Sequence, residues 1–376
     1  MNRLPFIILL SFTLIYSCKE STKEANYSAS LSYGDDITFK LDSLTSFSAN
    51  NPIFLNGQWC FFNSINNSIK CFDSDFKMEK TIDLPVSGPN SLVSPMGITT
   101  DGNSIYVSDY AKNTLDLIDN EGKVILDYYL QPDELENSTH ISTGLSQIKI
   151  DEQFIYVTFQ GNHNNNKSIN HSDPTIVRIN KFDSTKALFL NYPSNYQNLI
   201  TGGRQSIIAT TYNSKTKSLI VSFPLDHRVF ELKNDGSMRE HMAKSDQFDD
   251  FDGHYFNSLT SATNFKTIND KYLGNHSYWL IHYDKYTDTY IRFVNLPLEK
   301  HQMDVLNPDE ATLRKYKAIL LNSNFQKIGE SEILKDINLE LTQAKVFTTE
   351  DGVHVFAKNQ ENEDVMRFKT LKITYK

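Results

Sequence analysis

The chain has 376 residues, of which 37 are Lys or Arg and 46 are Asp or Glu, so its formal net charge is −9. Proteins that bind nucleic acid present basic faces, and this acidic chain has no Lys/Arg-rich run, which excludes nucleic acid as a partner. The 24 Phe and 19 Tyr, against 15 Gly, favour β-strands over helices. The length fits either two domains or one large β domain.

The first 17 residues predict a signal peptide. A basic start at Arg3 is followed by the apolar run Leu4–Tyr16, which is shorter than the ~20 residues that span a bilayer. Leu14–Cys18 resembles a bacterial lipobox, in which Cys18 becomes the acylated N-terminus; an ordinary secretory signal with a chance cysteine is the alternative. We expect a lipoprotein of the bacterial cell envelope, held to the outer membrane through Cys18 and facing the periplasm or the outside.

A degenerate period of roughly forty residues runs through the rest of the chain. The segment Ser104–Ser108 recurs as Phe154–Thr158, and more loosely as Gly352–Phe356. Short alternating segments of this kind are typical of strands. The repeat therefore indicates an all-β fold built from similar units.

A second repeated piece is a strand, a tight polar turn and another strand. Its Asp, Asn and Gly residues suit hairpin turns, which need positive φ or side chains that bond their own backbone. Two of the four copies have Phe in place of Gly. The copies are Leu117–Lys123, Leu232–Ser237, Cys71–Lys77 and Leu321–Lys327.

Together these pieces predict a six-bladed β-propeller of four-stranded antiparallel blades over residues 36–376, after a lipidated tether at 18–35. The last blade supplies only three strands, so we expect residues 36–41 to supply the fourth and to close the ring, pairing the segment near Ile37 with the strand near Lys372. A pair of β-sandwiches and a seven-bladed ring are the alternatives. The predicted blades span residues 49–85, 96–130, 144–192, 205–243, 277–334 (with 298–314 inserted) and 343–375.

The C-terminal third resembles a family of six-bladed, TolB/NHL-like propeller lipoproteins of Bacteroidota whose function is unknown. The resemblance implies a fold and an envelope location, and it carries over no catalytic residues. Its matching pieces are Ile281–Tyr286, Tyr290–Phe293, Ile328–Glu330, Phe347–Gly352 and Glu361–Asp364.

Cys60 and Cys71 remain once Cys18 is assigned to lipidation. If the hairpin between them turns at Ile65-Asn66, the two cysteines face each other on neighbouring strands. An oxidising compartment permits a disulfide, although packed thiols are the alternative. A disulfide between these two residues stays open at this stage.

Metal chemistry has one weak candidate, the acidic loop that holds Asp249, Asp250 and Asp252. Calcium prefers several oxygen ligands on one loop, but the EF-hand spacing is absent and a solvated acidic loop explains the residues equally. The pair His163 and His171 lacks a third ligand at a zinc spacing. No cofactor is expected, and a cation in the channel stays open.

Three residues are candidates for ligand binding. Arg204 precedes an innermost strand, where its guanidinium could grip a carboxylate or phosphate; Arg292 and His282 lie in the fifth blade. The alternatives are salt bridges between blades and plain packing. We expect a monomeric, non-catalytic binding module for a small molecule, glycan or protein, with a metal-dependent, lactonase-like hydrolase or lyase as the rival.

Overall fold

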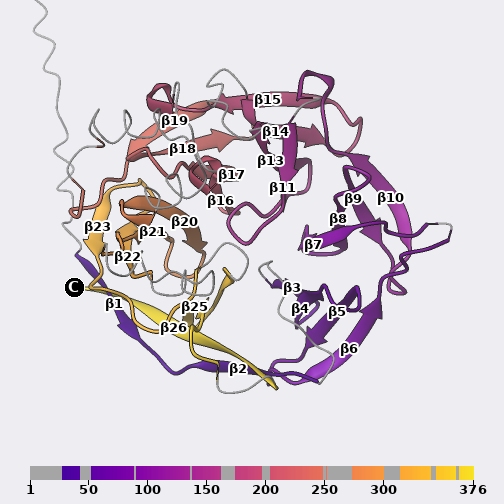
Figure 1. The fold of residues 1–376 in the computed structure, drawn as a ribbon, viewed down its shortest axis with the longest axis horizontal. Helices are drawn as coiled ribbons and strands as arrows, with labels where there is room; N and C mark the ends of the chain where they lie inside the picture. The colour runs from indigo at the N-terminus through magenta and orange to yellow at the C-terminus, as the bar shows by residue number, and fades with distance from the viewer. Residues whose placement is uncertain are drawn as a thin grey trace, which may run out of the picture.

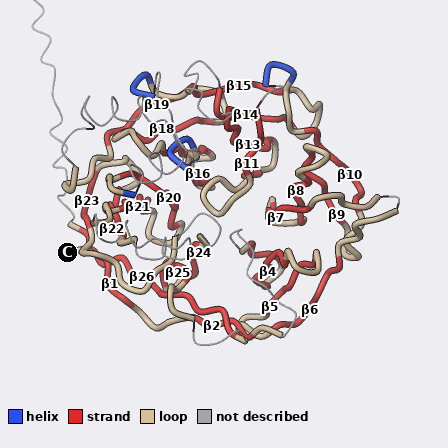
Figure 2. Tube along the Cα trace, viewed as in Figure 1, coloured by secondary structure: helices blue, strands red, loops and turns tan. Residues whose placement is uncertain are grey.

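In the computed structural model of this chain, six antiparallel sheets surround a common axis and form a closed ring (Figure 1). Figure 2 shows that the described helical segments are short and lie at the rim of the ring and beside β16 (Ala209–Asn213). The structure describes residues 28–42, 52–88, 90–135, 138–161, 174–196, 204–248, 251, 273–299, 314–339, 344–360 and 364–376. The prediction of six four-stranded blades is confirmed.

Each blade runs from an inner strand beside the axis to an outer strand at the rim (Figure 1). Blade one holds β3 (Ile53–Leu55), β4 (Gln58–Asn63), β5 (Ser68–Phe72) and β6 (Met78–Asp83). Blade two holds β7 (Pro95–Thr100), β8 (Ile105–Asp109), β9 (Thr114–Ile118) and β10 (Val124–Tyr129). Blade three holds β11 (Ser138–Ile141), β12 (Lys149–Ile150), β13 (Phe154–Gly161), β14 (Pro174–Asn180) and β15 (Lys186–Asn191).

The remaining blades complete the ring. Blade four holds β16 (Ala209–Asn213), β17 (Ser218–Ser222), β18 (Arg228–Lys233) and β19 (Met238–Met242). Blade five holds β20 (Ser277–Asp284), β21 (Thr289–Asn295), β22 (Tyr316–Leu321) and β23 (Lys327–Glu330). Blade six holds β24 (Val346–Thr349), β25 (Gly352–Phe356) and β26 (Val365–Tyr375), to which β1 (Ala29–Tyr33) and β2 (Ile37–Lys40) add from the N-terminus.

The N-terminal strands close the ring by pairing with β26, as predicted, but over a longer stretch. Ile37 lies opposite Phe368, whereas the partner of Lys372 is Ser32 in β1. The strand β1 falls in the range expected to be a tether, so the propeller begins no later than Ala29. One long C-terminal strand thus carries two short N-terminal ones, which leaves its edge covered.

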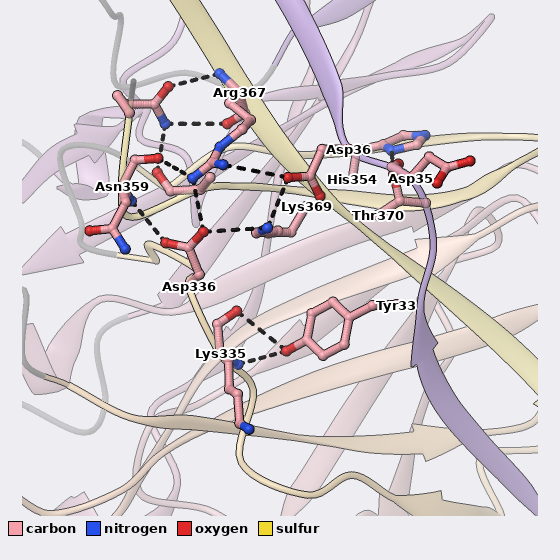
Figure 3. Close-up of polar contacts among 12 residues, drawn as sticks. Tyr33, Asp35, Asp36, Lys335, Asp336, His354, Asn359, Arg367, Lys369 and Thr370 are labelled. Atoms are coloured by element: carbon pink, nitrogen blue, oxygen red, sulfur yellow. Dashed lines mark hydrogen bonds and ion pairs between the residues drawn. The ribbon is translucent and has the colours of Figure 1, made fainter. Parts of the chain in front are cut away.

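Four charged side chains join the two chain ends at this seam (Figure 3). Asp36 lies 2.8 Å from Lys369 and 3.7 Å from Arg367. Asp336, from the loop after blade five, lies 2.9 Å from Arg367 and 3.4 Å from Lys369. Both acids therefore contact both bases, and a network of this kind holds its geometry better than an isolated surface pair.

An aromatic cluster lies beneath these charges, between blades six and one. Phe39 of β2 has no exposed surface and makes edge-on contacts with Phe61 and Phe72 of blade one at centroid distances of 4.9 and 5.1 Å. It meets Phe347 and Phe368 of blade six at 6.1 and 5.7 Å. A strand from the N-terminus therefore supplies the ring that packs the last blade against the first.

The repeated hairpin turn has the same backbone whether Gly or Phe occupies its left-handed position. Gly122 has φ 82°, while Phe76 and Phe325 have φ 58° and 61°. A left-handed residue with a side chain costs about 1–2 kcal/mol. Phe76 packs edge-on against Phe39 of β2 at 4.8 Å, and Phe325 stacks on His241 of blade four at 4.1 Å, so aromatic contacts between blades offset the strain.

Cys60 and Cys71 lie directly opposite each other in the β4–β5 pair, with Cα atoms 4.1 Å apart, and the structure joins them by a disulfide. Both are buried among the apolar residues between blades one and two. The bond closes a hairpin whose turn follows Asn63, where the sequence places it.

Candidate functional site

Blade three differs from the other blades because its innermost strand is interrupted. β11 and β12 both pair with β13, and residues 142–148 between them leave the sheet. The main chain of this segment is anchored to both neighbours: Thr99 Oγ1 donates to Ile148 O at 2.8 Å, and Thr210 N donates to Leu145 O at 3.0 Å. The predicted start of this blade at residue 144 therefore missed β11.

A cavity of about 250 Å³ lies at the mouth of the central channel next to this segment. It is formed by inner strands of blades three to six and by the first hairpin of blade one. Ser214 and Lys285, in the turns after β16 and β20, mark its rim. Its other described lining residues are Pro52, Trp59, Gln147, Lys149, Thr211, Tyr212, His282, Tyr283, Val346, Phe347 and Thr348.

The cavity has two chemically different walls. Blades one and six supply Pro52, Trp59, Val346 and Phe347, and the rings of Trp59 and Phe347 lie 4.4 Å apart. Blades three to five supply amide, hydroxyl, imidazole and ammonium groups. No Asp or Glu is among the described residues that line it, although the whole chain carries net negative charge.

Lys149 is the cation of the polar wall. Its Nζ donates to Gln147 Oε1 at 3.2 Å, a neutral acceptor, and no described carboxylate lies within 4.0 Å. Burial lowers the pKa of Lys149 to about 8, because a charged ammonium loses hydration there. An ammonium has three N–H donors, so the described surroundings of Lys149 leave donors for a bound molecule.

His282 lies across from Lys149 on β20. Its Nε2 is 2.6 Å from Thr348 Oγ1 in β24, which ties blade five to blade six beside the cavity. Burial, and next the charge of Lys149, lower the pKa of His282 to about 3. His282 is therefore neutral at physiological pH, and the predicted candidate does line the channel cavity.

Two tyrosines of the polar wall donate their hydroxyl protons to carboxylates that do not line the cavity. The hydroxyl of Tyr212 donates to Asp151 at 2.7 Å, and that of Tyr283 donates to Asp288 at 2.6 Å. Burial and these carboxylate neighbours raise the pKa of both tyrosines. Both tyrosines therefore stay neutral, and the carboxylates of Asp151 and Asp288 are not part of the cavity lining.

Arg292 lies elsewhere, between blades four and five, with no exposed surface. Its guanidinium carbon is 3.4 Å from the ring centroid of Tyr278. Six acceptors at 2.6–3.3 Å take its five N–H groups, so none is left for a ligand. They are Ser222 Oγ and the carbonyl oxygens of Phe223, Asp226, His227, Arg228 and Ala243.

The other predicted sites are only partly visible. Arg204 begins a short 3-10 turn, Arg204–Ser206, before β16, as expected, but its side chain lies outside the described residues. Cys18 and the acidic loop at Asp249, Asp250 and Asp252 also lie outside them. Within the described ranges, no three His, Cys, Asp or Glu side chains are placed to hold a metal ion.

No helix in the described part of the chain has the length and apolar character needed to cross a membrane. A lipobox-type anchor therefore remains a prediction from the first residues of the sequence.

Lys149 and Trp59 were missed at the sequence level. Lys149 had a usable signal, because Gln147, Lys149 and Asp151 alternate with Ile148 and Ile150, which places polar residues on one face of an inner strand. Trp59 had none, since only the closure of the ring brings the first hairpin beside β24.

Comparison with solved structures shows the same fold. A member of the DUF4221 family from Bacteroides vulgatus superposes with a TM-score of 0.73 at 20% identity, covering 93% of this chain and 99% of that one. A structure named "Putative exported protein" from Bacteroides fragilis gives 0.59 at 13% identity, covering 92% and 95%. Virginiamycin B lyase from Staphylococcus aureus is more distant, with a TM-score of 0.46 at 11% identity over 89% and 99% of the two chains.

Among curated proteins, no match was found. A family model described as "Domain of unknown function (DUF4221)" matches residues 27–332. The match begins just before β1 and includes blades one to five, so the motifs Phe347–Gly352 and Glu361–Asp364 fall beyond it. Because the model matches well over half of the sequence, the chain belongs to the DUF4221 family.

Proposed function

We propose that this protein is an envelope lipoprotein whose propeller binds a small molecule in the channel cavity without catalysing a reaction. The observation that carries the proposal is the cavity itself, about 250 Å³, lined by rigid inner strands from several blades. Pockets that combine an apolar surface with a few convergent polar groups are the usual form of small-molecule sites. The cavity also lies at a channel mouth, where a ligand can enter from solvent.

The lining favours binding over the rival metal-dependent hydrolysis. A catalytic divalent cation is held by oxygen or nitrogen ligands and activates water. The described lining residues instead present Lys149 and Lys285, and two ammonium groups repel a divalent cation. A binding site for an uncharged or anionic molecule suits this wall better.

An extracytoplasmic location is supported by the lipobox-like Leu14–Cys18 and by the exported name of the Bacteroides fragilis protein. Lipidation at Cys18 would leave nine residues, 19–27, between the anchor and the described chain. Replacing Cys18 by Ala should move the protein from the membrane pellet to the soluble fraction, because the acyl chains supply the attachment. Retention of the C18A variant in the membrane would contradict lipid anchoring.

Binding can be tested with the full-length protein solubilised from its own membrane. The protein is incubated with a low-molecular-weight extract of the producing cells and observed by native mass spectrometry. We expect a bound small molecule on the wild type, and its loss in Ser214→Trp, which fills the rim of the cavity.

The matched control is Ser237→Trp, in an exposed turn at the outer edge of the same blade, which should retain the molecule. No bound molecule on the wild type, or equal retention by Ser214→Trp, would overturn the proposal.

A further inference from the structure

The apolar wall of the channel cavity and Lys149 come from opposite sides of the propeller ring. The apolar residues come from blades one and six, which are neighbours in the ring, and Lys149 comes from blade three, across the axis from blade six, while Lys285 lies at the rim on blade five, next to blade six. A ligand that fills the cavity therefore meets aromatic carbon on one side and the ammonium of Lys149 on the other. The arrangement therefore favours a ligand with an apolar part at one end and a polar part at the other.

The charges of Lys149 and Lys285 indicate that the polar end of the ligand is anionic. Lys149 has one neutral acceptor, Gln147 Oε1 at 3.2 Å, and Lys285 at the rim contacts the ring of Tyr286 at 5.0 Å. Hydrogen bonds between an ammonium and a carboxylate are about twice as strong as neutral ones. A carboxylate would therefore supply the anionic partner that Lys149 lacks among the described residues.

The volume of the cavity limits the size of the apolar part of the ligand. An engineered cavity of about 150 Å³ holds benzene, so a cavity of about 250 Å³ takes one ring together with a carboxylate on a short chain. The rings of Trp59 and Phe347 are inclined at 52° to each other and form an apolar wall against which such a ring can pack.

We propose that the channel cavity binds a small planar carboxylate, with the carboxylate at Lys149 and the ring against Trp59. This inference rests on the proposed function and deepens it, since it names the chemical class of the ligand. Lys149 and Lys285 select the negative charge, and the ring of Trp59 binds the apolar body without regard to charge.

Three isosteric probes separate charge from shape: 4-fluorobenzoate, 4-fluorobenzamide and 4-fluorobenzamidine, followed by fluorine NMR on the full-length protein. The acid should bind saturably, the amide about tenfold more weakly, and the amidine not at all. Lys149→Met should remove most of this preference of acid over amide, and Lys285→Met a smaller part of it. The control Lys123→Met, an exposed residue of blade two paired with Glu121, should change nothing.

Trp59→Leu provides a second readout, because it should weaken the acid and the amide by the same factor. Raising the pH should weaken the acid alone. The ammonium of Lys149 loses its proton above about pH 8, and a bound anion moves that transition upward. Of the other groups that line the described cavity, His282 is already neutral and Tyr212 and Tyr283 stay so, so their protonation does not change over this range.

The outcomes distinguish this inference from the proposed function. Equal affinity for the three probes, or an unchanged preference in Lys149→Met, overturns the anion selection while small-molecule binding stands. If none of the three probes binds but a molecule from the cell extract is still retained, the planar carboxylate is again excluded while small-molecule binding stands. Acid binding that survives Ser214→Trp places the probe outside the cavity and overturns the inference.

Discussion

Arg292 is fully buried and Lys149 is half-buried, and the surroundings of these two cations are opposite. Arg292 lies between blades four and five, where its five N–H groups meet protein acceptors and its flat face covers Tyr278. Lys149 lies beside the channel cavity, where one neutral amide oxygen accepts from it. A buried charge is tolerated when hydrogen bonds replace its hydration, so the first cation serves the fold and the second is available to a ligand.

The pKa values of the two side chains follow the same division. Burial lowers the pKa of Arg292 to about 10, which leaves it charged at neutral pH. Burial lowers the pKa of Lys149 to about 8, close enough to neutrality for its charge to respond to a bound anion. Of the ligand-binding residues predicted from the sequence, His282 lies at the channel cavity and Arg292 lies in the interior. Lys149, which was not predicted, shares the position of His282.

The largest expected effect is on the joint between blades four and five. Arg292→Met leaves six buried acceptors without their donor, and each unsatisfied buried group costs about 1–3 kcal/mol. We expect the free energy of unfolding, measured by urea denaturation followed by intrinsic fluorescence, to fall by on the order of 5 kcal/mol. Arg292→Lys restores part of the loss, because an ammonium has three donors.

Arg239→Met is the matched control, since Arg239 is exposed on β19 and exposed substitutions change stability by about 0.5 kcal/mol or less. If Arg292→Met fails to fold, Arg292→Lys still measures the joint. Equal unfolding midpoints for Arg292→Lys, Arg239→Met and the wild type would contradict the structural role of Arg292.

A smaller effect is expected at the joint between blades six and one, which is aromatic rather than polar. Phe39→Ala removes the ring that contacts both blades and should lower the free energy of unfolding by about 3–4 kcal/mol. Phe182→Ala is the matched control, because Phe182 is 80% exposed. An equal effect of the two substitutions would show that the N-terminal strand contributes little to closure.

The smallest effect is expected at Lys149. Its pKa in the folded protein is lowered from 10.5 to about 8, so the unfolded chain holds the proton more tightly and the charge destabilises the fold at low pH. Lys149→Met should raise stability by at most about 1 kcal/mol near pH 6, and this gain should shrink as the pH rises from about 8 to 10.5. Urea denaturation across that range checks the sign.

Lys285→Met provides the control, since Lys285 is exposed and exposed substitutions change stability by about 0.5 kcal/mol or less. A loss of stability in Lys149→Met at pH 6 would mean that the protein satisfies Lys149 as fully as Arg292, and the contrast between the two cations would disappear.

The blade pattern could be predicted because it is local. Alternating segments such as Ile105–Asp109 and turns such as Asp119–Gly122 contain their own evidence for strand and hairpin, and the structure places both where the repeat predicts them. The prediction failed at β1 and β11, two short strands without a turn signal, which exist because β26 and β13 offer them a partner.

The amino-acid sequence by itself determined the number of blades, the hairpin turns and the pairing of the two chain ends, because each depends on a repeat or on residues close together in the chain. Only the tertiary structure decided which cations are satisfied and which face the channel. Trp59, Lys149 and His282 are far apart in the sequence and become neighbours when the ring closes. Alternation in the sequence marks the strand face that holds Lys149, but no local pattern joins residues of several blades into one site.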